Sequence, residues 1–181
     1  MIILADINAV KTFEMMLLLL LALVGDLRAY KIKNSITFFF AMAGAVTNFA
    51  LGGTGGLWYS LIGMVTPIII LFFFFAASML GAGDIKLFSA LGAITGYRQV
   101  LFIIVCSFFT GAVIAIVLMI MRKNTAKRFR HLIAYFKTCI LTFTISPYTD
   151  MADKADGAKF RFVSAIALGS IISLLMKKYM L

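Results

Sequence analysis

Two aspartates, Asp26 and Asp84, combine a reactive side chain with a position at the edge of an apolar run. The chain has only seven acidic residues, and the other five have ordinary explanations. Those five lie near the N-terminus or in a polar stretch near residue 150: Asp6, Glu14, Asp150, Asp153 and Asp156. An ionisable group at membrane depth costs at least a few kcal/mol, so a functional role is its default interpretation.

Two carboxyl groups held at one depth can carry out acid–base chemistry on a carbonyl. Like charges held close together do not both ionise, so the pair shares a proton and titrates as a unit. The ionised member can take a proton from water while the protonated member donates to the carbonyl oxygen. This is the chemistry of aspartyl peptidases. Helix capping, or pairing of Asp26 with Arg28 and of Asp84 with Lys86, accounts for the same spacing equally well.

The sequence predicts that the two aspartates lie at similar depth. With Lys11 and Arg98 as outer anchors of the first and fourth spans, Asp26 is 15 residues from its anchor and Asp84 is 14 residues from its own. At the rise of an α-helix these separations are about 22 Å and about 21 Å. Both carboxyls are therefore expected near one edge of a hydrocarbon layer of about 30 Å.

The rest of the chain predicts the membrane helices that would hold them. Hydrophobic residues make up 63% of the 181 residues and charged ones 13%, with a mean hydropathy of +1.06. A soluble domain has roughly 45–50% apolar and about 25% charged residues. Six apolar runs lie at residues 13–24, 35–51, 57–80, 85–97, 100–121 and 162–176. We expect one all-α integral membrane domain over residues 1–181, a polytopic bundle of about six transmembrane helices, with Asn34 as the N-cap of the second.

The charges orient this bundle. If the first connection is cytoplasmic, 13 basic residues lie inside and 4 outside, as the positive-inside rule requires. Residues 122–160 then form a basic cytoplasmic loop with an amphipathic segment suited to anionic lipids. A seventh span over residues 132–145 is the alternative. The basic residues that produce the net charge of +10 lie between the apolar runs. This distribution argues for a cell (plasma) membrane protein and against nucleic acid binding.

No cofactor or metal site is expected. Cys106 and Cys139 form neither a CxxC pair nor a zinc-ligand spacing, and His131 has no Cys or carboxylate at ligand spacing.

Three segments resemble a known family. Residues 81–87 read GAGDIKL, similar to the GxGDxKL signature of type IV prepilin peptidases. Residues 25–28 read GDLR and lead through a basic segment to Asn34, resembling that family's first motif. Residues 159–169 resemble its last-helix motif. The short chain is most similar to the compact members, which include preflagellin and tight-adherence prepilin peptidases.

The resemblance implies both an activity and a site. It implies cleavage of the basic cytoplasmic leader of a pilin-like or preflagellin-like precursor, with Asp26 and Asp84 as the catalytic pair. Gly81, Gly83, Asn34 and Lys86 would support the pair or bind substrate. At two residues from Asp84 on a helix, however, Lys86 would point away from that carboxylate. The competing hypotheses are a proton-coupled carrier and a non-catalytic pilus-assembly scaffold.

Overall fold

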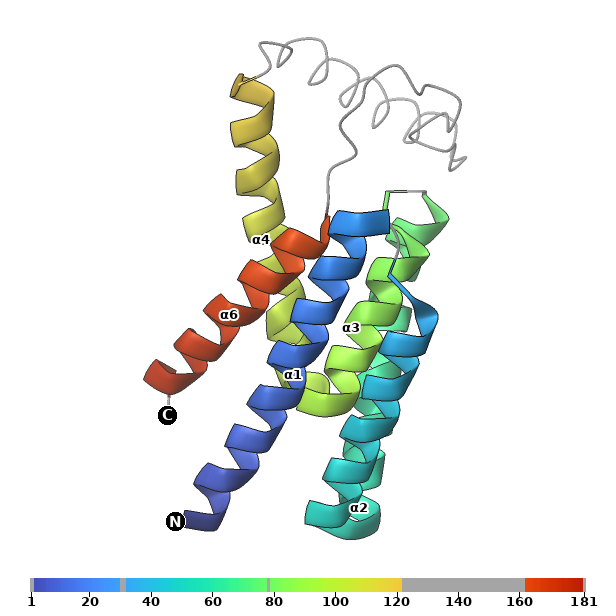
Figure 1. The fold of residues 1–181 in the computed structure, drawn as a ribbon, viewed down its shortest axis with the longest axis vertical. Coiled ribbons are helices and arrows are strands. Elements are labelled where there is room, and N and C mark those ends of the chain that lie inside the picture. The colour runs from blue at the N-terminus through green and yellow to red at the C-terminus, as the bar shows by residue number, and fades with distance from the viewer. Residues whose placement is uncertain (1, 30–31, 78, 122–161, 181) are drawn as a thin grey trace.

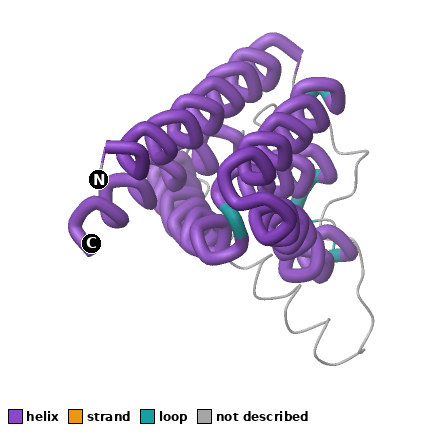
Figure 2. Tube along the Cα trace, turned by 90° about the horizontal axis from the view of Figure 1, so that it is seen from below, coloured by secondary structure: helices purple, strands orange, loops and turns teal. Residues whose placement is uncertain are grey.

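The computed structural model describes residues 2–29, 32–77, 79–121 and 162–180, and within these ranges the regular structure is entirely helical (Figures 1 and 2). The helices are α1 (Ile2–Ala29), α2 (Asn34–Ala76), α3 (Ala82–Thr95), α4 (Tyr97–Met121) and α6 (Phe162–Met180). The predicted all-α class is confirmed. The basic region at residues 122–160 and the alternative seventh span lie outside the described residues.

Helix α2 consists of two helical segments that fold back on each other at Gly53. Gly53 has a φ of 58° and a ψ of −141°, a conformation that only glycine adopts readily. Asn48 and Ser60, on opposite sides of this kink, both donate to the carbonyl oxygen of Ala93. In a straight helix, 12 residues would place them about 18 Å apart. The predicted turn at residues 52–56 therefore joins two antiparallel segments.

Helix α3 packs directly against both segments of α2 through glycines. A Cβ at Gly63 would lie 2.1 Å from the Gly92 carbonyl oxygen, and a Cβ at Gly44 would lie 2.8 Å from the Ile94 backbone. Small residues allow membrane helices to approach this closely. Every residue of α3 from 87 to 94 is buried, so α3 lies at the centre of the bundle.

Helix α3 ends at Gly96, whose φ of 81° breaks the helix. The last carbonyls of a helix have no partner within it, and side chains of α2 supply them here. Asn48 Nδ2 donates to the carbonyl oxygens of Ala93 and Ile94 at 2.9 and 3.2 Å, and the Tyr59 hydroxyl donates to that of Thr95 at 3.0 Å.

The break at Gly96 corrects one prediction. Arg98 is not the outer anchor of the segment that carries Asp84, because α4 already begins at Tyr97. Arg98 nevertheless lies at the same end of the bundle as Lys11. Their charged groups stack on the rings of Tyr97 and Tyr59, and these two rings pack edge to face at 5.9 Å.

Helices α4 and α6 form the second close pair. A Cβ at Gly169 would lie 2.5 Å from the Ser107 backbone nitrogen, and the Thr110 hydroxyl donates to the Ala165 carbonyl oxygen at 3.0 Å. The last predicted run, residues 162–176, is confirmed as part of α6.

The surface of the bundle is apolar. Large side chains such as Phe38 and Phe109 are 70% and 73% exposed, which is typical of contact with lipid rather than water. In the described part, α2 and residues Tyr97–Leu118 of α4 are long and apolar enough to cross a membrane, and Phe162–Met176 is a shorter apolar helix. These features indicate a membrane protein.

Candidate active site

Asp84 lies in the first turn of α3, where the chain holds its carboxylate close to the backbone. Gly81 is the N-cap residue, and its carbonyl oxygen accepts the Asp84 N–H at 3.1 Å. The Gly81 N–H in turn donates to the Asp84 carboxylate, a reciprocal arrangement like a capping box. The helix N-terminus also favours a negative charge at this position.

The two glycines of this segment have different surroundings. A Cβ at Gly81 would lie 3.1 Å from Asp84 Oδ2, so the bare backbone leaves space for the carboxylate. A Cβ at Gly83 would lie 3.5–3.7 Å from the Ile32 side chain, an ordinary contact. At both glycines the near neighbour is a side chain, the Asp84 carboxylate at Gly81 and Ile32 at Gly83.

Asp26 lies in the last turn of α1 and is buried, with 8% of its surface exposed. Its Oδ2 atom is one of three buried side-chain oxygens in the described residues that have no hydrogen-bond partner. Burying a polar atom without a partner costs free energy. An unsatisfied carboxyl oxygen of this kind is therefore a candidate for binding a water molecule or a substrate.

The fold brings Asp26 and Asp84 together. The C-terminal end of α1 and the N-terminal end of α3 lie at the same end of the bundle (Figure 1), and the Asp26 carboxyl interacts electrostatically with that of Asp84. The two residues are 58 positions apart in the sequence. The structure thus forms a carboxyl pair with one buried and one partly exposed member.

Lys86 and Asn34 form a link beside this pair. Lys86 Nζ donates to Asn34 Oδ1 at 3.0 Å, joining α3 to the start of α2 at the exposed rim. Lys86 therefore has a partner other than Asp84. The predicted N-cap role of Asn34 is wrong: Lys33 is the N-cap residue, with extended backbone, and Asn34 is the first residue of the helix.

Four aromatic rings from different helices pack together inside the bundle. Phe88 and Phe108 each pack on Phe162, with ring centroids 6.4 and 5.6 Å apart, and Phe74 packs on Phe108 at 5.3 Å. Together these rings connect α2, α3, α4 and α6.

Glu14 is a residue whose environment the sequence interpretation missed. It accepts a hydrogen bond from the Thr47 hydroxyl of α2 through Oε1, while its Oε2 is buried without a partner. The sequence signal was its position inside the first apolar run, where an acidic side chain costs free energy of insertion into the membrane. Among the described residues, no three His, Cys, Asp or Glu side chains cluster as metal ligands would.

The family profile described as type IV leader peptidase family matches residues 13–116. The chain belongs to the type IV leader peptidase family. The matched range includes Asp26, Asp84 and the Asn34–Lys86 link, whereas α6 lies beyond it. Comparisons with curated proteins and with solved structures gave no match. The family supports a leader-peptidase-like protease.

Proposed function

We propose that this protein is an intramembrane aspartyl endopeptidase in which Asp26 and Asp84 are the catalytic pair. The supporting observation is the electrostatic interaction between these two carboxyls, which come from separate helices that end and begin at the same end of the bundle (Figure 1). The unpartnered, buried Oδ2 of Asp26 adds a polar group that the fold itself does not use.

The pair has the groups that peptide hydrolysis requires. The ionised carboxylate takes a proton from a water molecule, whose oxygen attacks the carbonyl carbon of the scissile bond. The protonated carboxyl donates to the carbonyl oxygen, giving a tetrahedral intermediate. The carboxyl that took the proton from water then protonates the amide nitrogen, and the other carboxylate removes a hydroxyl proton from the intermediate. The C–N bond breaks, which leaves a new carboxyl and a new amine. Each aspartate thus acts both as an acid and as a base.

The proposed substrate is a pilin-like or preflagellin-like precursor with a short basic leader before an apolar helix. The bundle would span the membrane six times, counting α2 as two segments, with the aspartate end at the cytoplasmic face. The charge distribution supports this orientation, since most basic residues connect segments at that end. An apolar substrate helix could then enter the bilayer while its leader stays in the cytoplasm.

The deciding experiment is leader cleavage by membranes that carry Asp26→Asn, Asp84→Asn or both. Each single change removes the ability to trade a proton but keeps the side-chain size. We expect a loss of at least about 10³-fold for each, with little further loss in the double variant, as for residues that act as one unit. Membrane insertion should be preserved, because neutralising an acid at this depth removes a desolvation cost.

Asp150→Asn, Asp153→Asn and Asp156→Asn serve as controls, since these acids lie in the polar stretch between the fifth and sixth apolar runs. They should process the precursor normally. Robust cleavage by either active-site variant would exclude the mechanism and favour the scaffold or carrier hypotheses. A retained proton-coupled flux would then identify the carrier.

The orientation has its own test. Thr54→Cys, in the turn of α2, should react with an impermeant thiol reagent in intact cells, whereas Thr125→Cys should not. The reverse pattern would place the aspartates at the outer face.

A further inference from the structure

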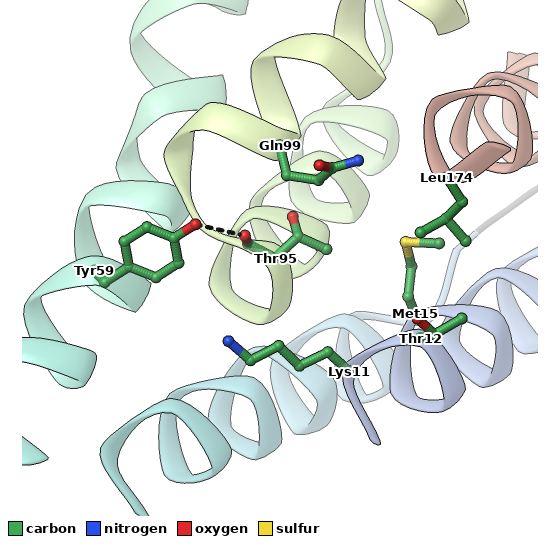
Figure 3. Close-up of a pocket in the computed structure, with 7 residues that line it drawn as sticks. All are labelled: Lys11, Thr12, Met15, Tyr59, Thr95, Gln99 and Leu174. Carbon is green, nitrogen blue, oxygen red and sulfur yellow. Dashed lines mark hydrogen bonds between the residues drawn. The ribbon is translucent and has the colours of Figure 1, made fainter. Parts of the chain in front are cut away.

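A polar cavity of about 240 Å³ lies at the end of the bundle opposite the aspartates. Side chains from all five described helices line it, including Lys11 of α1, Tyr59 of α2, Thr95 of α3, Gln99 of α4 and Leu174 of α6 (Figure 3). The peptidase mechanism uses none of these residues. The fold thus builds a second site, and the question is what it binds.

The polar side of the cavity offers hydrogen-bond donors. Lys11 Nζ lies 5.8 Å from the centroid of the Tyr59 ring, which places a positive charge at the wall. Gln99 Nε2 donates to Ser173 Oγ at 2.7 Å, and an amide nitrogen carries a second N–H. The Tyr59 hydroxyl is held in place by its bond to the Thr95 carbonyl oxygen. None of the described lining residues is acidic, and Lys11 is the one lining residue with a formal charge.

The opposite wall is apolar. Figure 3 shows Met15 and Leu174 beside each other, away from the Lys11 amino group. Met15 is fully buried. A ligand that fills the cavity would therefore combine a charged or polar group with an apolar neighbouring part.

Size and position restrict the ligand further. Sites for drug-sized molecules usually have about 300–1,000 Å³, so this cavity suits a single headgroup-sized moiety. The stacked Lys11–Tyr59 and Arg98–Tyr97 pairs lie at the same end. Tyrosines are enriched at the membrane–water interface, where lipid phosphates lie. A lysine also binds phosphate as a point charge.

We propose that this cavity binds a phosphate group, carried by an anionic lipid headgroup or free in solution, with Lys11 and Gln99 as its donors. The proposal depends on the membrane setting and not on the peptidase activity, so it can fail or hold independently of the proposed function.

The test uses the purified full-length chain and native mass spectrometry. The protein is incubated with phosphatidylglycerol or with diacylglycerol of the same acyl chains, and the retained lipid is measured with and without inorganic phosphate. We expect preferential retention of phosphatidylglycerol. Lys11→Met should reduce it about tenfold or more, as expected for a lost hydrogen bond to a charged group, whereas Lys11→Arg should keep most of it.

Arg98→Met is the matched control, because Arg98 is an exposed cation at the same end that does not line the cavity. It should retain the lipid. Displacement of the lipid by millimolar inorganic phosphate would identify a site that accepts free phosphate, and resistance to it a lipid site; both support the proposal. Equal retention of diacylglycerol, or equal loss in Lys11→Met and Arg98→Met at unchanged unfolding temperature, would overturn it. If Lys11→Met does not fold, the preference of the unmodified protein and of Lys11→Arg for phosphatidylglycerol over diacylglycerol still tests the proposal.

Discussion

The two helices that carry the aspartates are held in the bundle in different ways. Helix α3, with Asp84, packs backbone against backbone on α2, and its terminal carbonyls are bonded by α2 side chains. Helix α1, with Asp26, meets α2 through side chains: the Glu14–Thr47 hydrogen bond and the stacking of Lys11 on Tyr59. The α2–α3 unit therefore fixes one carboxyl rigidly, while the position of the other depends on how α1 is seated.

This difference predicts two classes of variant. Changes between α2 and α3 should damage the fold itself, because close-packed backbones cannot adjust without moving apart. Changes at the α1 contacts should leave a folded bundle with a displaced Asp26 and lower activity.

The largest effect is expected for Gly63→Ala. A Cβ at this position would lie 2.1 Å from the Gly92 carbonyl oxygen, a backbone atom that cannot rotate away. Overpacking of this kind costs about 1–3 kcal/mol or more. We expect a clearly lower unfolding temperature in detergent and reduced yield of folded protein.

Gly55→Ala is the matched control for that variant. A Cβ at Gly55 meets nothing within 4 Å, and alanine is the better helix former. Its unfolding temperature should stay the same or rise. If both variants were equally stable, the close α2–α3 packing would be wrong.

A smaller effect, on activity rather than on folding, is expected at Glu14. Glu14→Leu removes the acceptor for Thr47 and loosens α1, whereas Glu14→Gln keeps an acceptor oxygen of the same reach. Interhelical hydrogen bonds in membranes contribute about 0.6–2 kcal/mol, so leader cleavage by Glu14→Leu should fall roughly three- to thirtyfold at matched protein level. Glu14→Gln should retain most of the activity.

The pH profile separates two explanations for Glu14. If the carboxyl only positions α1, Glu14→Gln should keep the shape of the profile seen for the unmodified protein. An inactive Glu14→Gln variant, or one with a displaced profile, would show that Glu14 takes part in proton transfer.

Much of this arrangement could be predicted because lipid imposes simple rules. Apolar runs and intervening charges indicated the helices, and the position of two acids at the edges of such runs indicated the candidate carboxyl pair. The turn of α2 was visible as a glycine cluster at residues 52–56.

The features that the sequence did not predict depend on contacts between residues far apart in the chain, and no local pattern encodes such contacts. The boundary of α3 was misplaced because an apolar run does not show that Gly96 takes a positive φ against the Tyr59 ring. The N-cap prediction for Asn34 was wrong by one residue, because the Lys33 carbonyl oxygen already accepts the first hydrogen bonds of the helix. The Asn34 side chain is instead bonded to Lys86, 52 residues further along the chain. The cavity around Lys11 and Gln99 depends on all five described helices at once.

The smallest expected effects concern Gly81 and Gly83, the two glycines just before Asp84. Gly81→Ala would place a Cβ 3.1 Å from Asp84 Oδ2, so the carboxylate must shift by a few tenths of an ångström or give up its bond to the Gly81 N–H. Small displacements of reacting groups lower rates substantially, and we expect about a tenfold loss of leader cleavage. Gly83→Ala adds the same methyl group two residues away, where it meets only the Ile32 side chain at 3.5–3.7 Å. It should cost less than Gly81→Ala, because 3.5–3.7 Å is an ordinary contact that requires no movement of Ile32, whereas the Asp84 carboxylate has to move. A larger loss for Gly83→Ala would mean that the substrate backbone, rather than Asp84, needs the space at this turn. The position of Asp84 would then not explain the loss of leader cleavage.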